Sequence, residues 1–207
     1  MLHTKIYLEI AKTNLRHNFL LPFAAAVGIV FLAGLLYGTT ALDALETAKP
    51  LEFFLCFTGA ALLTPLFLPE QEKDIRDVVL SKKVNYGIVC MIRLLYNVIA
   101  MGLLVAAFGL KLYLGECAVS WTHISGAVVT ALFLGAVGLF AAGISGNVVI
   151  GFMAVILFYL ANYGLKGKLG VFYLFSMSSG QLGPKWWLLF GAILLIAAGT
   201  YRQMRAG

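Results

Sequence analysis

Long apolar runs separated by short polar stretches dominate the pattern along this chain. A helix needs about 20 residues to cross the hydrocarbon core of a bilayer. Six runs approach or reach this length, at residues 19–37, 51–68, 86–110, 124–144, 147–163 and 186–200. The pattern predicts an all-α, polytopic membrane protein with six transmembrane helices, in a single transmembrane domain that covers residues 1–207.

Residues 3–18 show helical periodicity of a different kind. Ile6 and Ile10 share one side with Leu15, and lysine and arginine side chains alternate with them. This pattern predicts a basic amphipathic helix that lies in the membrane interface ahead of the first span. An ordinary solvated helix at the N-terminus is the alternative.

The composition excludes a water-soluble enzyme. Hydrophobic residues make up 61% of the chain and charged residues 12%, whereas soluble domains have about 45–50% and 25%. The formal net charge is +6. In a membrane protein this basic excess belongs to cytoplasmic flanks and anionic headgroups rather than to nucleic acid. Most basic residues fall on the side of both termini, so we expect both termini to be cytoplasmic in a multi-pass protein of the cell membrane.

Groups that could drive transport are missing from the span centres. An ion-coupled carrier needs ionisable side chains near the bilayer midplane. The nine carboxylates and three histidines of this chain all lie near span ends or in loops. There is also no GxxxxGK[ST] phosphate-binding loop and no metal-ligand cluster. If the protein moves a substrate uphill, the energy must come from a partner.

One short motif matches that of an enzyme family. Residues 143–146 read Gly-Ile-Ser-Gly, which matches the GxSG motif of rhomboid intramembrane proteases. Those enzymes need a histidine on a later span to activate the serine. Here His3, His17 and His123 all precede Ser145. We therefore interpret Ser145 as part of a tight turn between two spans and expect no catalytic residue.

The most charged stretch, residues 69–85, follows the second span. Ile75, Val78 and Val79 fall on one helical face, and acidic and basic residues alternate around the rest. A cytoplasmic helix of this kind can place its apolar face in a partner's groove while its charges set the register. A solvated helix that packs only on its own bundle is the alternative.

Arg93 is the one charged residue well inside a predicted span, and Asn97 lies one helical turn further on the same face. Arg93 is close enough to the cytoplasmic interface to extend its guanidinium into it. An interfacial anchor and a gate or pathway residue are both open interpretations.

The order of these elements resembles the permease subunits of type-2 ATP-binding-cassette (ABC) exporters. In that family a basic elbow helix precedes six spans, a coupling helix joins spans 2 and 3, a tight turn joins spans 4 and 5, and a re-entrant segment, here residues 164–185, precedes span 6. Glu70 and Glu72 match the acidic start of the family's coupling motif, and residues 79–81 match its Leu-Leu-Ser end. Residues 74–75 are Asp-Ile where Gly-Thr is usual, and the motif's proline is absent.

The resemblance implies a homo- or heterodimer of permeases above two separate ATPase subunits. ATP and Mg²⁺ would be held by the ATPases, so we expect no cofactor in this chain. The substrate would pass between the permeases along spans 1, 2 and 5. The expected ATPase-docking residues are Glu70, Glu72, Asp74, Ile75, Arg76, Val78, Val79 and Ser145. A membrane assembly or scaffold protein without transport activity is the alternative function.

Overall fold

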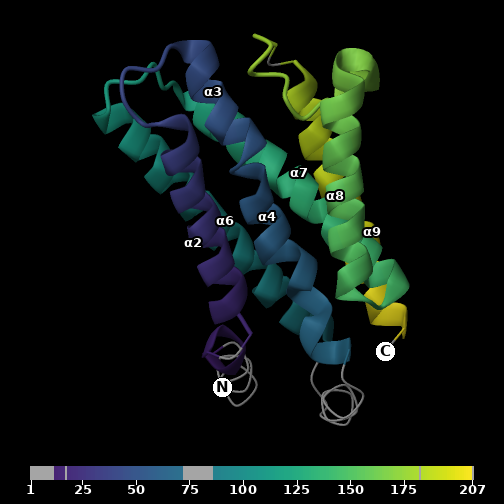
Figure 1. Ribbon diagram of the computed structural model, residues 1–207. Coiled ribbons are helices and arrows are strands. Elements are labelled where there is room, and N and C mark those ends of the chain that lie inside the picture. The colour runs from purple at the N-terminus through teal and green to yellow at the C-terminus, as the bar shows by residue number, and fades with distance from the viewer. Residues whose placement is uncertain (1–11, 17, 72–85, 182, 207) are drawn as a thin grey trace.

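The computed structural model describes residues 12–16, 18–71, 86–181 and 183–206. Every regular element in these residues is a helix, and none of them forms a strand. Five of the described helices are long and apolar enough to cross a membrane. The predicted class, an all-α polytopic protein, agrees with this architecture, in which the helices run side by side between two ends (Figure 1).

The start of α2 and the end of α9 lie on the same side of the bundle. In Figure 1, α2 (Leu20–Tyr37) rises from the lower end, and α9 (Pro184–Ala206) descends to it. The bounds of α2 agree with the predicted first span. Of the predicted interfacial helix at residues 3–18, residues 12–16 are helical, whereas residues 1–11 and 17 lie outside the described residues.

The second membrane-crossing path consists of three helical pieces: α3 (Ala44–Phe53), α4 (Cys56–Leu63) and the 3₁₀ helix η1 (Thr64–Gln71). It begins seven residues before the predicted start at residue 51. The carboxylate of Asp43 accepts a hydrogen bond from the backbone N–H of Glu46 at 2.7 Å, which caps the helix and starts it in a polar stretch. The path kinks at Pro65, where φ is −83° and ψ is 15°.

Three long helices follow: α6 (Tyr86–Leu114), α7 (Trp121–Ser145) and α8 (Val148–Leu165). The predicted tight turn joins the last two. Gly146 ends α7 with φ +66°, a backbone conformation that favours glycine. Asn147 then caps α8, because its Oδ1 accepts from the N–H of Val149 at 2.8 Å. The turn therefore follows from two neighbouring residues suited to opposite helix ends.

The chain between α8 and α9 folds back into the upper end of the bundle. A short 3₁₀ helix, η2 (Lys166–Phe172), comes first, and residues 173–183 lead to α9. Leu174 and Phe175 are fully buried in a cluster with residues of α4, α7, α8 and α9. α9 is not among the five candidate spans found in the described residues. A sixth span therefore stays a prediction.

Small residues let α7 pack closely against α4. A Cβ atom at Gly135 would lie 2.5 Å from the carbonyl oxygen of Gly59, and one at Gly59 would overlap the carbonyl group of Ala131. Gly138 is similarly close to Thr64. Close backbone approach through small residues is the usual way that helices associate in a membrane. These small residues of α7 thus serve packing within the chain.

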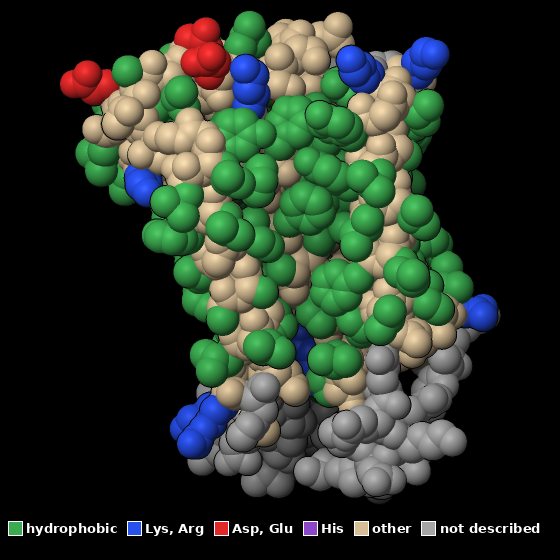
Figure 2. All heavy atoms as spheres, in the orientation of Figure 1, with side chains coloured by type: hydrophobic (Ala, Val, Ile, Leu, Met, Phe, Trp, Pro, Cys, Tyr) green, Lys and Arg blue, Asp and Glu red, His purple; other side chains and the backbone are tan. Residues whose placement is uncertain are grey.

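The side of the bundle is mainly hydrophobic. Figure 2 shows green side chains covering the middle of one face, with blue side chains towards both ends and red ones only at the upper end. Large exposed apolar residues occur on several helices, among them Leu21, Phe31, Leu103, Leu157 and Phe190. An apolar belt between two charged rims is the surface expected of a protein that spans a bilayer.

Candidate functional site

An apolar groove runs between α2, α4 and α8. Its volume is about 550 Å³, and Asn18 is the only polar one among the described residues that line it. α2 contributes Ala25 and Ile29, α4 contributes Phe57, and α8 contributes Ile156. The groove therefore has room for the apolar part of a small molecule or a lipid chain, and it offers no charged group to a polar one.

The groove reaches the lower end of the bundle. Asn18, Leu68 and Val148 line it there, close to the start of α2, the end of η1 and the start of α8. A second, very small cavity adjoins this mouth and shares Asn18, Pro22 and Pro65 with the groove. The lower mouth is thus where polar residues come near an otherwise apolar surface.

The predicted pathway residues Arg93 and Asn97 both line that small cavity. Each is about 5% exposed, and the Nη1 atom of Arg93 donates to the carbonyl oxygen of Leu66 at 3.4 Å. The guanidinium is therefore turned into the bundle, towards η1, rather than out to the surface. The structure brings Arg93, Asn97 and Asn18 together beside the groove's lower mouth.

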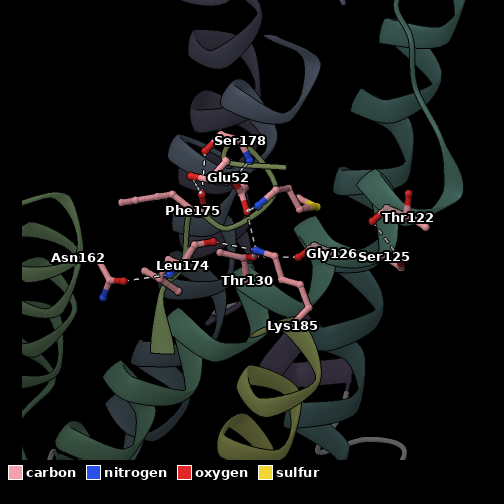
Figure 3. Close-up of polar contacts among 12 residues, drawn as sticks. Glu52, Thr122, Ser125, Gly126, Thr130, Asn162, Leu174, Phe175, Ser178 and Lys185 are labelled. Atoms are coloured by element: carbon pink, nitrogen blue, oxygen red, sulfur yellow. Dashed lines mark hydrogen bonds and ion pairs between the residues drawn. The ribbon is translucent and has the colours of Figure 1, made fainter. Parts of the chain in front are cut away.

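A buried ion pair lies at the upper end, and sequence analysis did not assign it a role. The Nζ atom of Lys185, at the start of α9, donates to Oε1 of Glu52 in α3 at 2.6 Å (Figure 3). The same oxygen accepts from the backbone N–H of Met177, and Oε2 accepts from that of Ser178, both at 2.8 Å. Glu52 is 0% exposed and Lys185 is 6% exposed. The carboxylate thus joins α3, α9 and the segment between α8 and α9.

The ammonium group of Lys185 has three acceptors. Besides Glu52, it donates to Oγ1 of Thr130 at 2.6 Å and to the carbonyl oxygen of Leu174 at 2.7 Å. An ammonium has three N–H bonds, so each has a partner. Burial lowers the pKa of Lys185 from its ordinary value, and the charge of Glu52 acts in the opposite direction. A paired and fully bonded charge is the form in which a lysine can be buried.

The sequence carried only a weak signal for this pair. Glu52 stands beside Leu51, Phe53 and Phe54, and Lys185 precedes two tryptophans. A lone acid and a lone base in apolar surroundings indicate buried charges that need a partner. The two residues are 133 positions apart, however, and only the packing of α3 against the end of the 173–183 segment makes them neighbours.

The predicted docking residues are only partly described. Ser145 lies exposed in the turn between α7 and α8, where its Oγ donates to the carbonyl oxygen of Ala141 at 2.7 Å. Glu70 falls within η1. Six predicted residues lie outside the described residues: Glu72, Asp74, Ile75, Arg76, Val78 and Val79. The chain leaves the described residues at Gln71 and re-enters them at Tyr86, and both positions are at the lower end (Figure 1).

His123 lies at the opposite end of α7 from Ser145. Its Nδ1 accepts from the backbone N–H of Ser120 at 3.1 Å and caps the helix. Among the described residues, no group of three or more His, Cys, Asp or Glu could hold a metal ion. The GxSG motif is therefore a turn in this structure, without a histidine partner in the residues described around it.

The fold and the groove define the class of this protein: a multi-pass helical membrane protein with an apolar, laterally placed groove. No protein-family model matches the chain, and comparison with the curated proteins and with the solved structures found no match. Assignment of a function therefore depends on the groove and on the residues at its two ends.

Proposed function

We propose that this chain is the membrane-spanning permease subunit of an ATP-driven ABC exporter, which works as a dimer and is coupled to separate ATPase subunits through residues 70–83. The observation that carries the proposal is the groove between α2, α4 and α8. These helices correspond to spans 1, 2 and 5, along which the resemblance places the pathway.

The lining of the groove supports a translocation surface for an apolar or amphiphilic substrate. Nearly every lining residue is apolar, so desolvation of a hydrocarbon chain there would be favourable and a sugar or an ion would leave its polar groups unpaired. Some lining residues of α2 and α8 are also exposed at the side of the bundle, among them Leu21 and Ile156. A second permease against this side would turn the groove into an enclosed passage.

The lower end offers the place for an ATPase. That side holds the end of η1, the start of α6 and the turn at Ser145, together with the positive charges of Lys12, Arg16 and Arg202. In the positive-inside orientation this is the cytoplasmic side. An ATPase that moves the 70–83 segment would act on η1, which borders both the groove and the cavity around Arg93.

The decisive experiment is purification of the tagged chain in mild detergent, followed by mass spectrometry of what accompanies it. We expect a stoichiometric soluble subunit with a Walker motif, together with a second permease. Reversal of three acidic charges (Glu70→Lys, Glu72→Lys and Asp74→Lys) should release the ATPase and leave the thermal unfolding of the bundle unchanged. A chain that purifies alone, or with partners that lack a Walker motif, would refute the permease assignment and favour a scaffold role.

The groove is tested separately in the purified complex. Ala25 is an exposed residue of the groove wall, and Ala25→Trp would fill part of the volume. ATP hydrolysis by the complex in lipid vesicles should change with this variant. Ala107 on α6 is also exposed but lines none of the groove, so Ala107→Trp is the matched control. Equal activity of both variants and the parent would exclude the groove from the transport cycle.

A further inference from the structure

A group of aromatic side chains adjoins the groove through Phe57, which lines it. Phe57 also contacts Tyr159 of α8, with ring centroids 4.6 Å apart. Phe175 packs against Tyr159 at 5.3 Å and stacks on Phe53 of α3 at 4.3 Å. The hydroxyl of Tyr159 donates to the carbonyl oxygen of Phe53 at 3.2 Å. We call Phe53, Phe57, Tyr159 and Phe175 the aromatic closure.

One member of the aromatic closure comes from a segment that is not a helix. Phe175 belongs to residues 173–178, here called the strap, which cross from η2 towards α9. The strap has little helical hydrogen bonding of its own, so its position depends on side chains of the bundle. Oδ1 of Asn162 accepts from the N–H of Leu174 at 2.9 Å, and Glu52 accepts from the N–H groups of Met177 and Ser178.

We propose that Glu52 and Lys185 form a latch that fastens the strap, and with it Phe175, over the upper end of the groove. The latch holds the strap from both sides, because Glu52 accepts from its N–H groups and Lys185 donates to its Leu174 carbonyl. In the proposed permease, on which this last step rests, the latch must release for substrate to leave at the upper end.

Loss of either partner of the latch should strongly destabilise the upper end of the bundle. Each charge has lost its contact with water and is compensated by the other charge, by the strap and, for Lys185, by the hydroxyl of Thr130. Removal of one partner leaves an unpaired buried charge, which is much more destabilising than removal of both. The carboxylate also serves backbone N–H groups, so exchanging the two residues would place an ammonium against N–H donors and would not restore the strap.

Cys56 provides a built-in reporter of the strap's position. Its side chain is 0% exposed and belongs to the same buried cluster as Leu174 and Phe175. It lies one helical turn beyond Glu52. If the strap lifts, a water-soluble maleimide can reach the Cys56 thiol. Cys117 is buried elsewhere in the upper half, in a cluster with Leu51, Leu112 and Ala127, and should stay protected when only the strap moves.

The experiment measures maleimide labelling of two single-cysteine proteins in lipid nanodiscs, one retaining Cys56 and one retaining Cys117. Lys185→Met and Glu52→Gln should each raise the labelling rate of Cys56 by about tenfold or more, since labelling follows the population of the locally opened state. The Cys117 protein should show no more than a small change. Lys49→Met and Glu46→Gln, both at exposed positions of α3, are the matched controls and should leave Cys56 protected.

The double variant separates a latch from two independent effects. With both charges removed, Cys56 labelling should be no faster than in the faster single variant, because the unpaired charge is gone. Multiplicative rates would overturn the pairing. Equal acceleration at Cys56 and Cys117 would show that the residues hold the whole fold rather than the strap, and no acceleration at Cys56 would refute the latch outright.

The addition of nucleotide provides an independent test of the role of the latch in transport. In the unmodified chain captured with its ATPase, ATP and Mg²⁺ should accelerate Cys56 labelling, and Lys185→Met should abolish this dependence by keeping the strap loose. Labelling of the isolated chain needs no ATPase, so the closure can be established even if the permease assignment fails. Nucleotide-independent labelling in an active complex would exclude release of the latch from the transport cycle.

Discussion

Replacement of Gly59 by alanine tests the packing on which the bundle depends. The added methyl group would overlap the carbonyl group of Ala131 on α7, and an ordinary contact there requires about 3.4 Å. The obstacle is backbone rather than the end of a flexible side chain, so α4 and α7 must move apart. Overpacking of this kind destabilises by about 1–3 kcal/mol.

A second glycine provides a control with the opposite sign. Gly102 in α6 has no atom within 4 Å of the position that its Cβ would take. Alanine is about 1 kcal/mol more favourable than glycine in a helix. Gly102→Ala should therefore raise the free energy of unfolding by up to about this amount. In Gly59→Ala the same gain offsets part of the overpacking. At the upper end of the overpacking range, the net loss of unfolding free energy is about 2 kcal/mol.

The three cysteines make thermal unfolding easy to follow. Cys56, Cys90 and Cys117 are all buried, so a maleimide that fluoresces on reaction reports their exposure as the protein unfolds. A loss of about 2 kcal/mol corresponds to a midpoint about 4–8 °C lower for a chain of this size. Gly102→Ala should raise the midpoint slightly.

The contact also predicts how two substitutions combine. Gly59 and Gly135 face each other across the same crossing, so one separation of α4 from α7 relieves both added methyl groups. Gly59→Ala with Gly135→Ala should lower the midpoint by less than the sum of the single effects. A rise of the midpoint for Gly59→Ala as large as that for Gly102→Ala would refute the close approach of these two helices.

Two further substitutions test hydrogen bonds at the upper end of the bundle. Asp43→Ala removes the cap of α3 and should cost about 1 kcal/mol in unfolding free energy, while Asp43→Asn, which keeps an acceptor, should retain most of it; equal midpoints for both variants would contradict the cap. Asn162→Leu leaves the buried N–H of Leu174 without its acceptor, a loss of about 1–3 kcal/mol, and should speed maleimide labelling of Cys56; unchanged labelling would contradict the anchoring of the strap by Asn162.

The hydrophobic pattern was sufficient to predict most of the helices. α2, α6, α7 and α8 all lie within a few residues of their predicted bounds, because a run of some 20 apolar residues has one stable form in a bilayer. The turn at Gly146 was also predictable, since Ser-Gly-Asn between two such runs allows little else. The start of α3 was missed because residues 44–50 are polar, although Asp43 is a good N-cap residue.

The upper site could not have been predicted from periodicity. Glu52 and Lys185 each fall at the edge of an apolar run, where a charged residue normally faces water. Their burial depends on the strap, whose backbone N–H groups complete the coordination of Glu52. Local sequence patterns describe one helix or strand at a time, whereas this site is assembled from four separate parts of the chain, α3, α7, the strap and α9.

The two ends of the groove are connected through three consecutive helical pieces, α3, α4 and η1. η1, which accepts from Arg93 at Leu66, continues directly from α4, and α3 carries Glu52 above it. Gly59, where this path is tightly packed on α7, lies seven residues from Leu66 and seven from Glu52. The path is interrupted between α3 and α4 and kinked at Pro65, so Gly59 is the tightly packed point between its two ends. In the proposed permease, any movement that an ATPase gives to η1 must pass this contact with α7 before it reaches Glu52 and the latch.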